Sequence, residues 1–199
     1  MDDRIRVLHV DDDPPVLDLA ADVLESVGEG MDITQETTAT DALDRLGSER
    51  IDCVLSDYEM PEMDGIAFLE QVREEYGDLP FVLYTGKGSE EIASEAISAG
   101  VTDYLQKESG LEHYRLLANK IETAVARDRA ERELRATKAQ YQRLVEQDLV
   151  GIYLIQNGAF RFVNEKLADI HGYDRDRMIG MSPLDVVAEC DRERVSQHL

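Results

Sequence analysis

The stretch Val54-Leu55-Ser56-Asp57-Tyr58-Glu59-Met60-Pro61-Glu62-Met63-Asp64-Gly65 decides the fold of this 199-residue chain. A short apolar run ends at Asp57, and a turn with Pro61 and Gly65 follows, which is typical of a buried strand, a loop and then a helix. Ligand sites in open parallel sheets form outside the carboxyl ends of the strands, so Asp57 stands where a ligand would bind. One aspartate after one strand also fits a purely structural role, so the interpretation depends on the other strands.

The same strand-then-helix pattern occurs five times in the first half of the chain. Short apolar runs alternate with amphipathic stretches, and this order predicts an α/β fold in which helices cover both faces of a parallel sheet. The expected strands are 5–10, 31–36, 52–56, 81–84 and 102–105. The expected helices are 14–27, 40–48, 65–76, about 90–99 and a long one from 111. Asp13 and Ser89 stand at N-cap positions of the first and fourth helices.

Polar side chains follow four of these strands: Asp11 with Asp12, then Asp57, Thr85 and Lys107. The carboxyl ends of parallel strands meet at one sheet edge, so these groups should lie together. Three close carboxylates repel one another, which should raise at least one pKa and favour a divalent cation, and oxygen-only ligation suits Mg²⁺. A phosphoryl group held there is open to attack by Asp57, with Lys107 and Thr85 contacting its oxygens.

These residues resemble the receiver domain of two-component response regulators, over residues 5 to about 124. The resemblance rests on Val10-Asp11-Asp12, on Asp57 within Ser-Asp-Tyr-Glu-Met-Pro-Glu-Met-Asp-Gly, on Thr85, and on Asp103-Tyr104-Leu105-Gln106-Lys107. It implies a flavodoxin-like, doubly wound, five-stranded sheet and a protein that is not an enzyme in the ordinary sense. Asp57 would accept a phosphoryl group from a histidine kinase or phosphotransfer protein.

The resemblance also assigns the remaining roles. Mg²⁺ would bind Asp11, Asp12, Asp57 and the backbone carbonyl of Glu59, and Lys107 would hold the phosphate. Thr85 and Tyr104 would form the conformational switch. Two positions depart from the family pattern: Glu108 stands where proline is usual and Gly86 where alanine is common.

From Leu111 no glycine or proline occurs until Gly151, which predicts an unusually long helix. Leu117, Ile121 and Ala124 form a seam with 4–3 spacing. The seam slips by about one residue near Asp128 and continues as Ala130, Leu134, Thr137, Tyr141 and Leu144. We interpret residues 125–146 as a linker that pairs with a second copy in a coiled coil, giving a homodimer; a solvated single helix is the alternative.

Residues 147–199 resemble the beginning of a PAS domain, an α+β fold, and stop before its remaining strands. The resemblance rests on Gly151-Ile152-Tyr153, Gln156-Asn157-Gly158, Phe162-Val163-Asn164, His171-Gly172-Tyr173 and Ile179-Gly180. Asn157-Gly158 between apolar runs predicts a β-hairpin, and Asn164 is placed to cap the next helix. Three segments are therefore expected, 1–124, 125–146 and 147–199.

Charge and composition limit the functions further. The net charge of −22 argues against direct binding to nucleic acid and suits a cytoplasm of very high salt, as in haloarchaea. Residues 1–110 carry 28 acidic and seven basic residues, whereas residues 111–146 carry six and eight. The two cysteines show no metal or disulfide pattern, and no apolar run is long enough to cross a membrane. These features predict a soluble protein of the cytoplasm.

Two other functions remain open from the sequence. A phosphatase resembling the haloacid dehalogenase superfamily would use Asp11 and Asp13, but Asp57 would then have no role. The chain is alternatively a fragment of a hybrid histidine kinase, in which case the kinase lies beyond residue 199, because no acidic residue follows His113 as in a phosphoacceptor box.

Overall fold

The computed structural model describes residues 4–28, 30–86, 90–145 and 150–193, apart from the side chains of residues 142–145. The chain divides into two compact units, Met1–Arg132 and Glu133–Leu199. The expected N-cap at Ser89, the side chain of Leu144 and the expected boundary between residues 146 and 147 lie outside the described residues.

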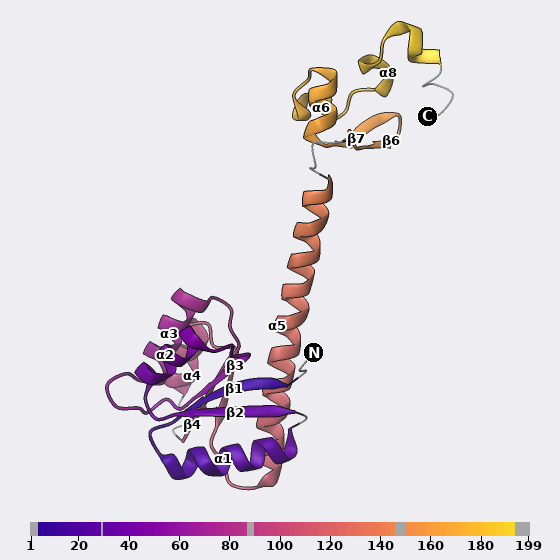
Figure 1. Cartoon of the computed structure of the whole chain (residues 1–199). Coiled ribbons are helices and arrows are strands. Elements are labelled where there is room, and N and C mark those ends of the chain that lie inside the picture. The colour runs from indigo at the N-terminus through magenta and orange to yellow at the C-terminus, as the bar shows by residue number, and fades with distance from the viewer. Residues whose placement is uncertain (1–3, 29, 87–89, 146–149, 194–199) are drawn as a thin grey trace. The chain divides into compact units, whose positions relative to one another are not determined.

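The first unit is a five-stranded parallel sheet with helices on both faces (Figure 1). Its strand order is β2-β1-β3-β4-β5, the flavodoxin-like order that the resemblance implied. The strands are β1 (Ile5–Val10), β2 (Met31–Glu36), β3 (Cys53–Ser56), β4 (Phe81–Thr85) and β5 (Asp103–Gln106). The helices are α1 (Pro14–Val27), α2 (Ala39–Ser48), α3 (Gly65–Tyr76), α4 (Glu90–Ser98) and the part of α5 (Leu111–Val145) up to Arg132.

Each face of the sheet has its own apolar core. Helices α2, α3 and α4 cover one face, where Phe68 and Phe81 meet edge to face at 5.5 Å between ring centroids. Helix α1 and the first half of α5 cover the other face (Figure 1), where Leu24, Val82 and Leu117 are buried. Strands β3 and β4 are buried along their whole length because both of their faces are covered, which is why they read as continuous apolar runs.

Two expectations from the sequence are wrong in detail. Asp13 occupies the N-cap position of α1, but its side chain makes no capping bond; its backbone N–H donates to Asp11 Oδ1 instead. Leu117, Ile121 and Ala124 are not a seam between subunits, because they are buried against the sheet of their own chain. A 4–3 spacing of apolar residues is common to both kinds of packing, so the spacing did not distinguish them.

The second unit contains the expected hairpin, formed by β6 (Tyr153–Gln156) and β7 (Ala159–Val163). Asn157 and Gly158 both have positive φ, 55° and 76°, as a two-residue turn of the favoured hand requires. Asn164 caps α6 (Glu165–His171) by accepting from Leu167 N–H. The described part of this unit also contains the short helices α7 (Arg175–Met178) and α8 (Pro183–Val186) and a 3₁₀ turn (Glu189–Asp191).

None of the described helices is both long enough and apolar enough to cross a membrane.

Candidate functional site

Strands β1 and β3 deliver three aspartates to one point of the sheet edge. The two strands are parallel neighbours, and Val10 is paired with Ser56, the last residue of each strand. Asp57 N–H then donates to Val10 C=O at 2.8 Å, which fixes the position of Asp57 beside Asp11. Carboxylate oxygens of Asp11, Asp12 and Asp57 all lie within 4.8 Å of one another. Asp11 and Asp57 are buried and Asp12 is exposed, so the cluster opens to the surface on the side of Asp12.

Lys107 brings a positive charge to this cluster from the end of β5. Its backbone N–H donates to Thr85 C=O at 2.7 Å. Its ammonium lies 2.5 Å from Asp11 Oδ2 and 3.1 Å from Asp57 Oδ1, and 5.8 Å from the centroid of the Tyr84 ring. Burial disfavours this ammonium, yet hydrogen bonds and attraction to Asp11 and Asp57 raise the pKa of Lys107 overall. Lys107 is therefore held charged between the two buried carboxylates.

The two buried carboxylates differ in how far their oxygens are engaged. Asp11 Oδ1 accepts from Asp13 N–H, and Asp11 Oδ2 accepts from Lys107. Asp57 Oδ1 is buried and has the longer ion pair with Lys107, at 3.1 Å, with no well-aligned hydrogen bond among the described residues. Burial raises the pKa of Asp57, and repulsion by Asp11 adds to this, while Lys107 opposes it. The sequence predicted a raised pKa from repulsion, but loss of hydration is the larger cause.

This donor set fits a magnesium ion. Three carboxylates lie together without a histidine or cysteine among them, and hard divalent cations prefer such oxygen ligands. The buried Asp57 Oδ1 has its ion pair with Lys107 but no well-aligned hydrogen bond among the described residues, and a cation or a transferred group would supply a further partner. Asp11, Asp12 and Asp57 are thus the side chains that would hold Mg²⁺, and Glu59 is in the exposed loop that follows Asp57.

The other residues singled out in the sequence lie on neighbouring strands. Thr85 is the last residue of β4 and is fully buried. Tyr104 is on β5, paired with Leu83, and packs at the edge of the core under α2, α3 and α4. The backbone hydrogen bond from Lys107 N–H to Thr85 C=O places Thr85 beside the cluster. On β5, Gln106 is the residue paired with Thr85, and Tyr104 is two positions earlier in that strand.

The loop from β3 to α3 holds the cluster in place through Gly65. The backbone N–H of Gly65 donates to Tyr58 C=O at 2.9 Å. Asp64 caps α3 by accepting from the N–H groups of Ile66 and Ala67. A Cβ on Gly65 would lie 2.2 Å from the Asp57 carbonyl oxygen. The sequence marked Gly65 only as a turn residue; it is also where the backbone of α3 lies so close to the Asp57 carbonyl that a Cβ would not fit.

Two histidines, His9 and His113, are buried within the first unit. His9 on β1 is completely buried, and neither ring nitrogen has a hydrogen-bond partner among the described residues. His113 is buried on α5, stacks on Tyr84 with 5.6 Å between ring centroids, and accepts from Glu108 N–H at 3.4 Å. A proline at position 108 would have no N–H for this bond. The position of His9 within an apolar strand predicted its burial. Nothing in the sequence predicted that His113 would accept a hydrogen bond from Glu108 N–H.

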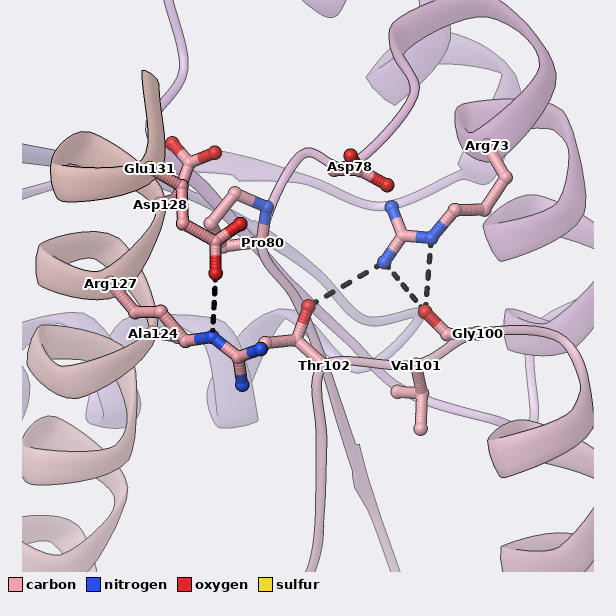
Figure 2. Close-up of a pocket in the computed structure, with 10 residues that line it drawn as sticks. All are labelled: Arg73, Asp78, Pro80, Gly100, Val101, Thr102, Ala124, Arg127, Asp128 and Glu131. Carbon is pink, nitrogen blue, oxygen red and sulfur yellow. Dashed lines mark hydrogen bonds and ion pairs between the residues drawn. The ribbon is translucent and has the colours of Figure 1, made fainter. Parts of the chain in front are cut away.

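A pocket of about 320 Å³ lies at the opposite edge of the sheet (Figure 2). Pro80 and Thr102, which line it, precede β4 and β5, whereas Asp57 follows β3. Arg73 donates to Gly100 C=O at 3.0 and 2.8 Å and to Leu79 C=O at 2.8 Å, so its guanidinium ties together the loops after α3 and α4. Arg127 pairs with Glu131 along α5. This pocket is separate from the aspartate cluster.

Comparison with known proteins agrees with the fold. Residues 7–119 match the family model of the response regulator receiver domain. The transcriptional regulatory protein FixJ of Bradyrhizobium diazoefficiens is 34% identical over 102 residues, which is 51% of this chain and 49% of that protein. The bacterioopsin transcriptional activator of Halobacterium salinarum is 30% identical over 189 residues, 88% of this chain and 28% of that protein. The chain thus spans about half or less of these relatives.

Solved structures give the same result. A CheY-like receiver domain protein from Methanospirillum hungatei has a TM-score of 0.58 at 28% identity, over 64% of this chain and 98% of that one. The chemotaxis response regulator CheY4 of Vibrio cholerae has a TM-score of 0.54 at 25% identity, over 59% of this chain and 98% of that one. By its fold, by its edge of three aspartates and a lysine, and by a family match over more than half its length, the chain belongs to the response regulator receiver domain family of two-component systems.

Proposed function

We propose that Asp57 accepts a phosphoryl group from a histidine kinase or a phosphotransfer protein, with Mg²⁺ bound by Asp11, Asp12, Asp57 and the Glu59 carbonyl. The observation that carries this is the difference between the two buried carboxylates. Asp11 is held at both oxygens, by Asp13 N–H and by Lys107 at 2.5 Å, while the buried Asp57 Oδ1 has the longer ion pair with Lys107, at 3.1 Å. Asp57 is therefore the less tightly held carboxylate of the two and the better nucleophile.

The transfer is an in-line displacement at phosphorus. An Asp57 carboxylate oxygen forms the new P–O bond as the P–N bond to the donor imidazole breaks, and the nitrogen keeps the electron pair and takes up a proton. Lys107, already 3.1 Å from Asp57, places its charge against the phosphoryl oxygens. Mg²⁺ supplies further neutralisation of the carboxylates and phosphoryl oxygens when it is bound.

The change of charge at Asp57 is proposed to reach the rest of the chain through Thr85 and Tyr104. Thr85 is joined to Lys107 through the backbone, and Tyr104 is on the adjoining strand. A phosphoryl oxygen that recruits the Thr85 hydroxyl would favour a different packing of Tyr104 at the edge of the core. The resulting state would be passed through α5 to the C-terminal segment, which we propose to be the first part of a PAS domain.

The similarity to the bacterioopsin transcriptional activator supports the idea of a shared C-terminal segment. That alignment covers 88% of this chain and so extends past the receiver fold, whereas the family match ends at residue 119. Control of transcription through a further part of the protein is the output that this relative and FixJ suggest.

Phosphorylation with acetyl phosphate and Mg²⁺ tests the proposal. The unchanged chain should gain one phosphoryl group per chain that is labile to alkali and to hydroxylamine, as an acyl phosphate is, detected by mass spectrometry. Asp57→Asn should abolish the gain, and Asp11→Asn should require more Mg²⁺ for the same yield. Asp13→Asn is the matched control, because that side chain is exposed and makes no capping bond, and it should label like the unchanged chain.

The same experiment separates the alternatives. Labelling that survives Asp57→Asn but disappears with Asp11→Asn would favour a phosphatase resembling the haloacid dehalogenase superfamily, with Asp11 as nucleophile. The hybrid-kinase alternative predicts the same labelling of Asp57 and is decided by the native sequence beyond residue 199. His113 does not serve as its phosphoacceptor, because it is buried between Tyr84 and Glu108.

A further inference from the structure

The peptide groups on both sides of Lys107 are hydrogen-bonded, one to the sheet and one to a side chain. Lys107 N–H donates to Thr85 C=O at 2.7 Å, which continues the pairing of β5 with β4 by one residue. The next N–H, that of Glu108, donates to Nε2 of His113 at 3.4 Å. Because β5 ends at Gln106, the bond to His113 holds a peptide group that has already left the sheet.

The imidazole of His113 is oriented by the same aromatic ring that the Lys107 ammonium faces. Tyr84 is buried, and its ring stacks on that of His113 with 5.6 Å between centroids and 22° between planes. Lys107 Nζ is 5.8 Å from the centroid of the Tyr84 ring. An ammonium within about 6 Å of an aromatic face is attracted to it. Tyr84 therefore lies between the lysine and the histidine that bonds the peptide after it.

His113 is itself firmly held in the first turn of α5. It is buried, and its backbone N–H donates to Gly110 C=O at 3.1 Å. Tyr114 also meets its ring edge to face, with 6.3 Å between ring centroids. A buried side chain packed on two rings has little freedom to move. The connection from β5 to α5 is short, so a fixed point on His113 restrains the backbone beside Lys107.

We propose that His113 is a positioning residue for Lys107. By accepting from Glu108 N–H, it fixes the backbone from which the lysine side chain extends, so that the ammonium meets a phosphoryl group on Asp57. The inference thus rests on the proposed function of Asp57. Lysine is long and flexible, and its ammonium is now 3.1 Å from Asp57 Oδ1. A displacement of about 1 Å at a reacting centre can lower a rate by about 100-fold.

Packing alone is the other explanation for a buried histidine, and two substitutions separate the explanations. His113→Phe keeps a ring that can stack on Tyr84 but has no acceptor for Glu108 N–H. His113→Gln loses the stack but keeps an acceptor, because glutamine Oε1 reaches about as far from the backbone as histidine Nε2. If His113 only fills the core, phenylalanine is the better replacement. If His113 positions Lys107, glutamine is the better replacement.

Single-turnover labelling with acetyl phosphate at saturating Mg²⁺ is the first measurement. His113→Phe should label Asp57 at least about tenfold more slowly than the unchanged chain, and His113→Gln less than about threefold more slowly. Tyr114→Phe is the matched control, because it removes a polar atom from the neighbouring buried residue and leaves the acceptor of Glu108 N–H in place. It should label at the unchanged rate. Labelling of His113→Phe that is no slower than that of His113→Gln would overturn the proposal.

Magnesium affinity shows whether a slow variant is merely damaged. Titration calorimetry with Mg²⁺ reports on the proposed ligands Asp11, Asp12 and Asp57, and Lys107 is not among them. His113→Phe should bind Mg²⁺ no more weakly than the unchanged chain while it labels slowly, because the ammonium has moved and the carboxylates have not. A parallel loss of affinity and rate would indicate a general disruption of the sheet edge and would overturn the positioning role.

Removal of the donor gives an independent test. Glu108→Pro has no N–H at this position, so the acceptor on His113 has nothing to hold. In this background His113→Phe should change the labelling rate by less than about twofold, whatever the rate of Glu108→Pro itself. An equal effect of His113→Phe with and without the donor would contradict the role of the hydrogen bond and overturn the proposal.

Amide exchange at Glu108 separates a failure of this inference from a failure of the proposed function. The Glu108 N–H should exchange slowly in the unchanged chain and in His113→Gln, and at least about tenfold faster in His113→Phe, with or without a phosphoryl group. An unchanged chain that is not labelled at Asp57 would overturn the proposed function, and the positioning role with it, even with this exchange pattern. Normal labelling of Asp57 with equal exchange in all three proteins would overturn the positioning role alone.

Discussion

The Asp57 carboxylate shows how single residues set the chemistry of this edge of the sheet. Its backbone is fixed by the bond to Val10 C=O, and its Oδ1 is buried with Lys107 3.1 Å away as the nearest positive charge. A carboxylate that is both buried and incompletely bonded is costly, and such strain is typical of functional sites. Gly65 lies against the Asp57 backbone, and the buried His9 is on the neighbouring strand β1.

Gly65→Ala should destabilise the first unit, although alanine is normally the better helix residue by about 1 kcal/mol. The added Cβ would lie 2.2 Å from the Asp57 carbonyl oxygen and 2.8 Å from Leu83 Cδ1, and the backbone oxygen cannot move without shifting Asp57. We expect a loss of roughly 2–4 kcal/mol in the free energy of unfolding, measured with urea.

Gly47→Ala is the matched control for this substitution. Gly47 is within α2, and its added Cβ would meet only Tyr76 Oη at 3.7 Å, so the change should be neutral or stabilising by up to about 1 kcal/mol. Equal effects at the two glycines would contradict the role of Gly65 in the close approach.

His9 should make the stability of the first unit depend on pH. Burial lowers the pKa of His9 to about 4, with Asp11 opposing and Lys107 adding to the shift, while an unfolded histidine titrates near 6.5. Above about pH 6.5 both states are neutral, and below it the unfolded state alone takes up the proton. Stability is therefore full above pH 6.5 and falls as pH decreases towards 4, by roughly 3 kcal/mol in total.

The measurement is urea unfolding at pH 7 and pH 4.5 without divalent cations, for the unchanged chain and for His9→Met. Methionine is of similar size and has no ionisable group, so the variant should lose less stability between the two pH values. The comparison also removes the contribution of Asp57, whose raised pKa acts in the opposite direction. The same loss in both proteins would show that His9 does not control the pH dependence.

At the scale of elements, the second unit depends on one buried amide. Asn164 accepts from Ile152 N–H at 2.8 Å and from Leu167 N–H at 3.1 Å, and donates to Val150 C=O at 2.9 Å. It joins the segment before β6 to the end of β7 and caps α6. The sequence predicted the cap but not the two bonds to the preceding segment, which arise only when the hairpin has folded.

Asn164→Ala should release the hairpin. The substitution leaves the Ile152 N–H and the Val150 C=O without their partners, at roughly 1–3 kcal/mol for each group that stays buried. Amide exchange of Tyr153–Val163 should accelerate accordingly, measured by hydrogen–deuterium exchange. Gln156→Ala, at an exposed position of β6, should change the exchange little, and equal acceleration in both variants would contradict the role of Asn164.

At the scale of the whole molecule, the two units differ in the size of their cores. The first unit has two apolar clusters, one on each face of the sheet. Within the described residues, the second has one cluster of five buried residues, Phe160, Val163, Leu167, Ala168 and Met178. Its hairpin has two strands, and two-stranded sheets are marginally stable in water. The second unit therefore buries little apolar surface, and the free energy gained from that burial is small compared with the conformational entropy lost when its residues become ordered.

We expect the amides of β6 and β7 to exchange far faster than those of β1, β3 and β4 in the dilute chain. Protection should increase only at concentrations where two copies associate. Protection that is independent of concentration in a chain shown to be monomeric would mean that the second unit folds alone.

The sequence by itself determined the order of strands and helices, the parallel sheet and the set of polar residues at its edge. Those features are local: alternating apolar runs fix the elements, and strands that run in parallel bring Asp11, Asp57 and Lys107 to one edge whatever the details of packing. The hairpin at Asn157-Gly158 is local in the same sense, because the turn alone requires two positive φ angles.

Only the tertiary structure decided which groups meet. Spacing along α5 could not tell that Leu117 and Ile121 pack on the sheet while Leu134 and Tyr141 stay exposed, because one periodicity serves both kinds of packing. Nor could it tell that Lys107 would lie closer to Asp11 Oδ2 than to Asp57 Oδ1. Burial, pKa and the choice of partner depend on atoms that are distant in the chain, Asp11 and Lys107 being 96 residues apart, and they are fixed only when the strands are in place.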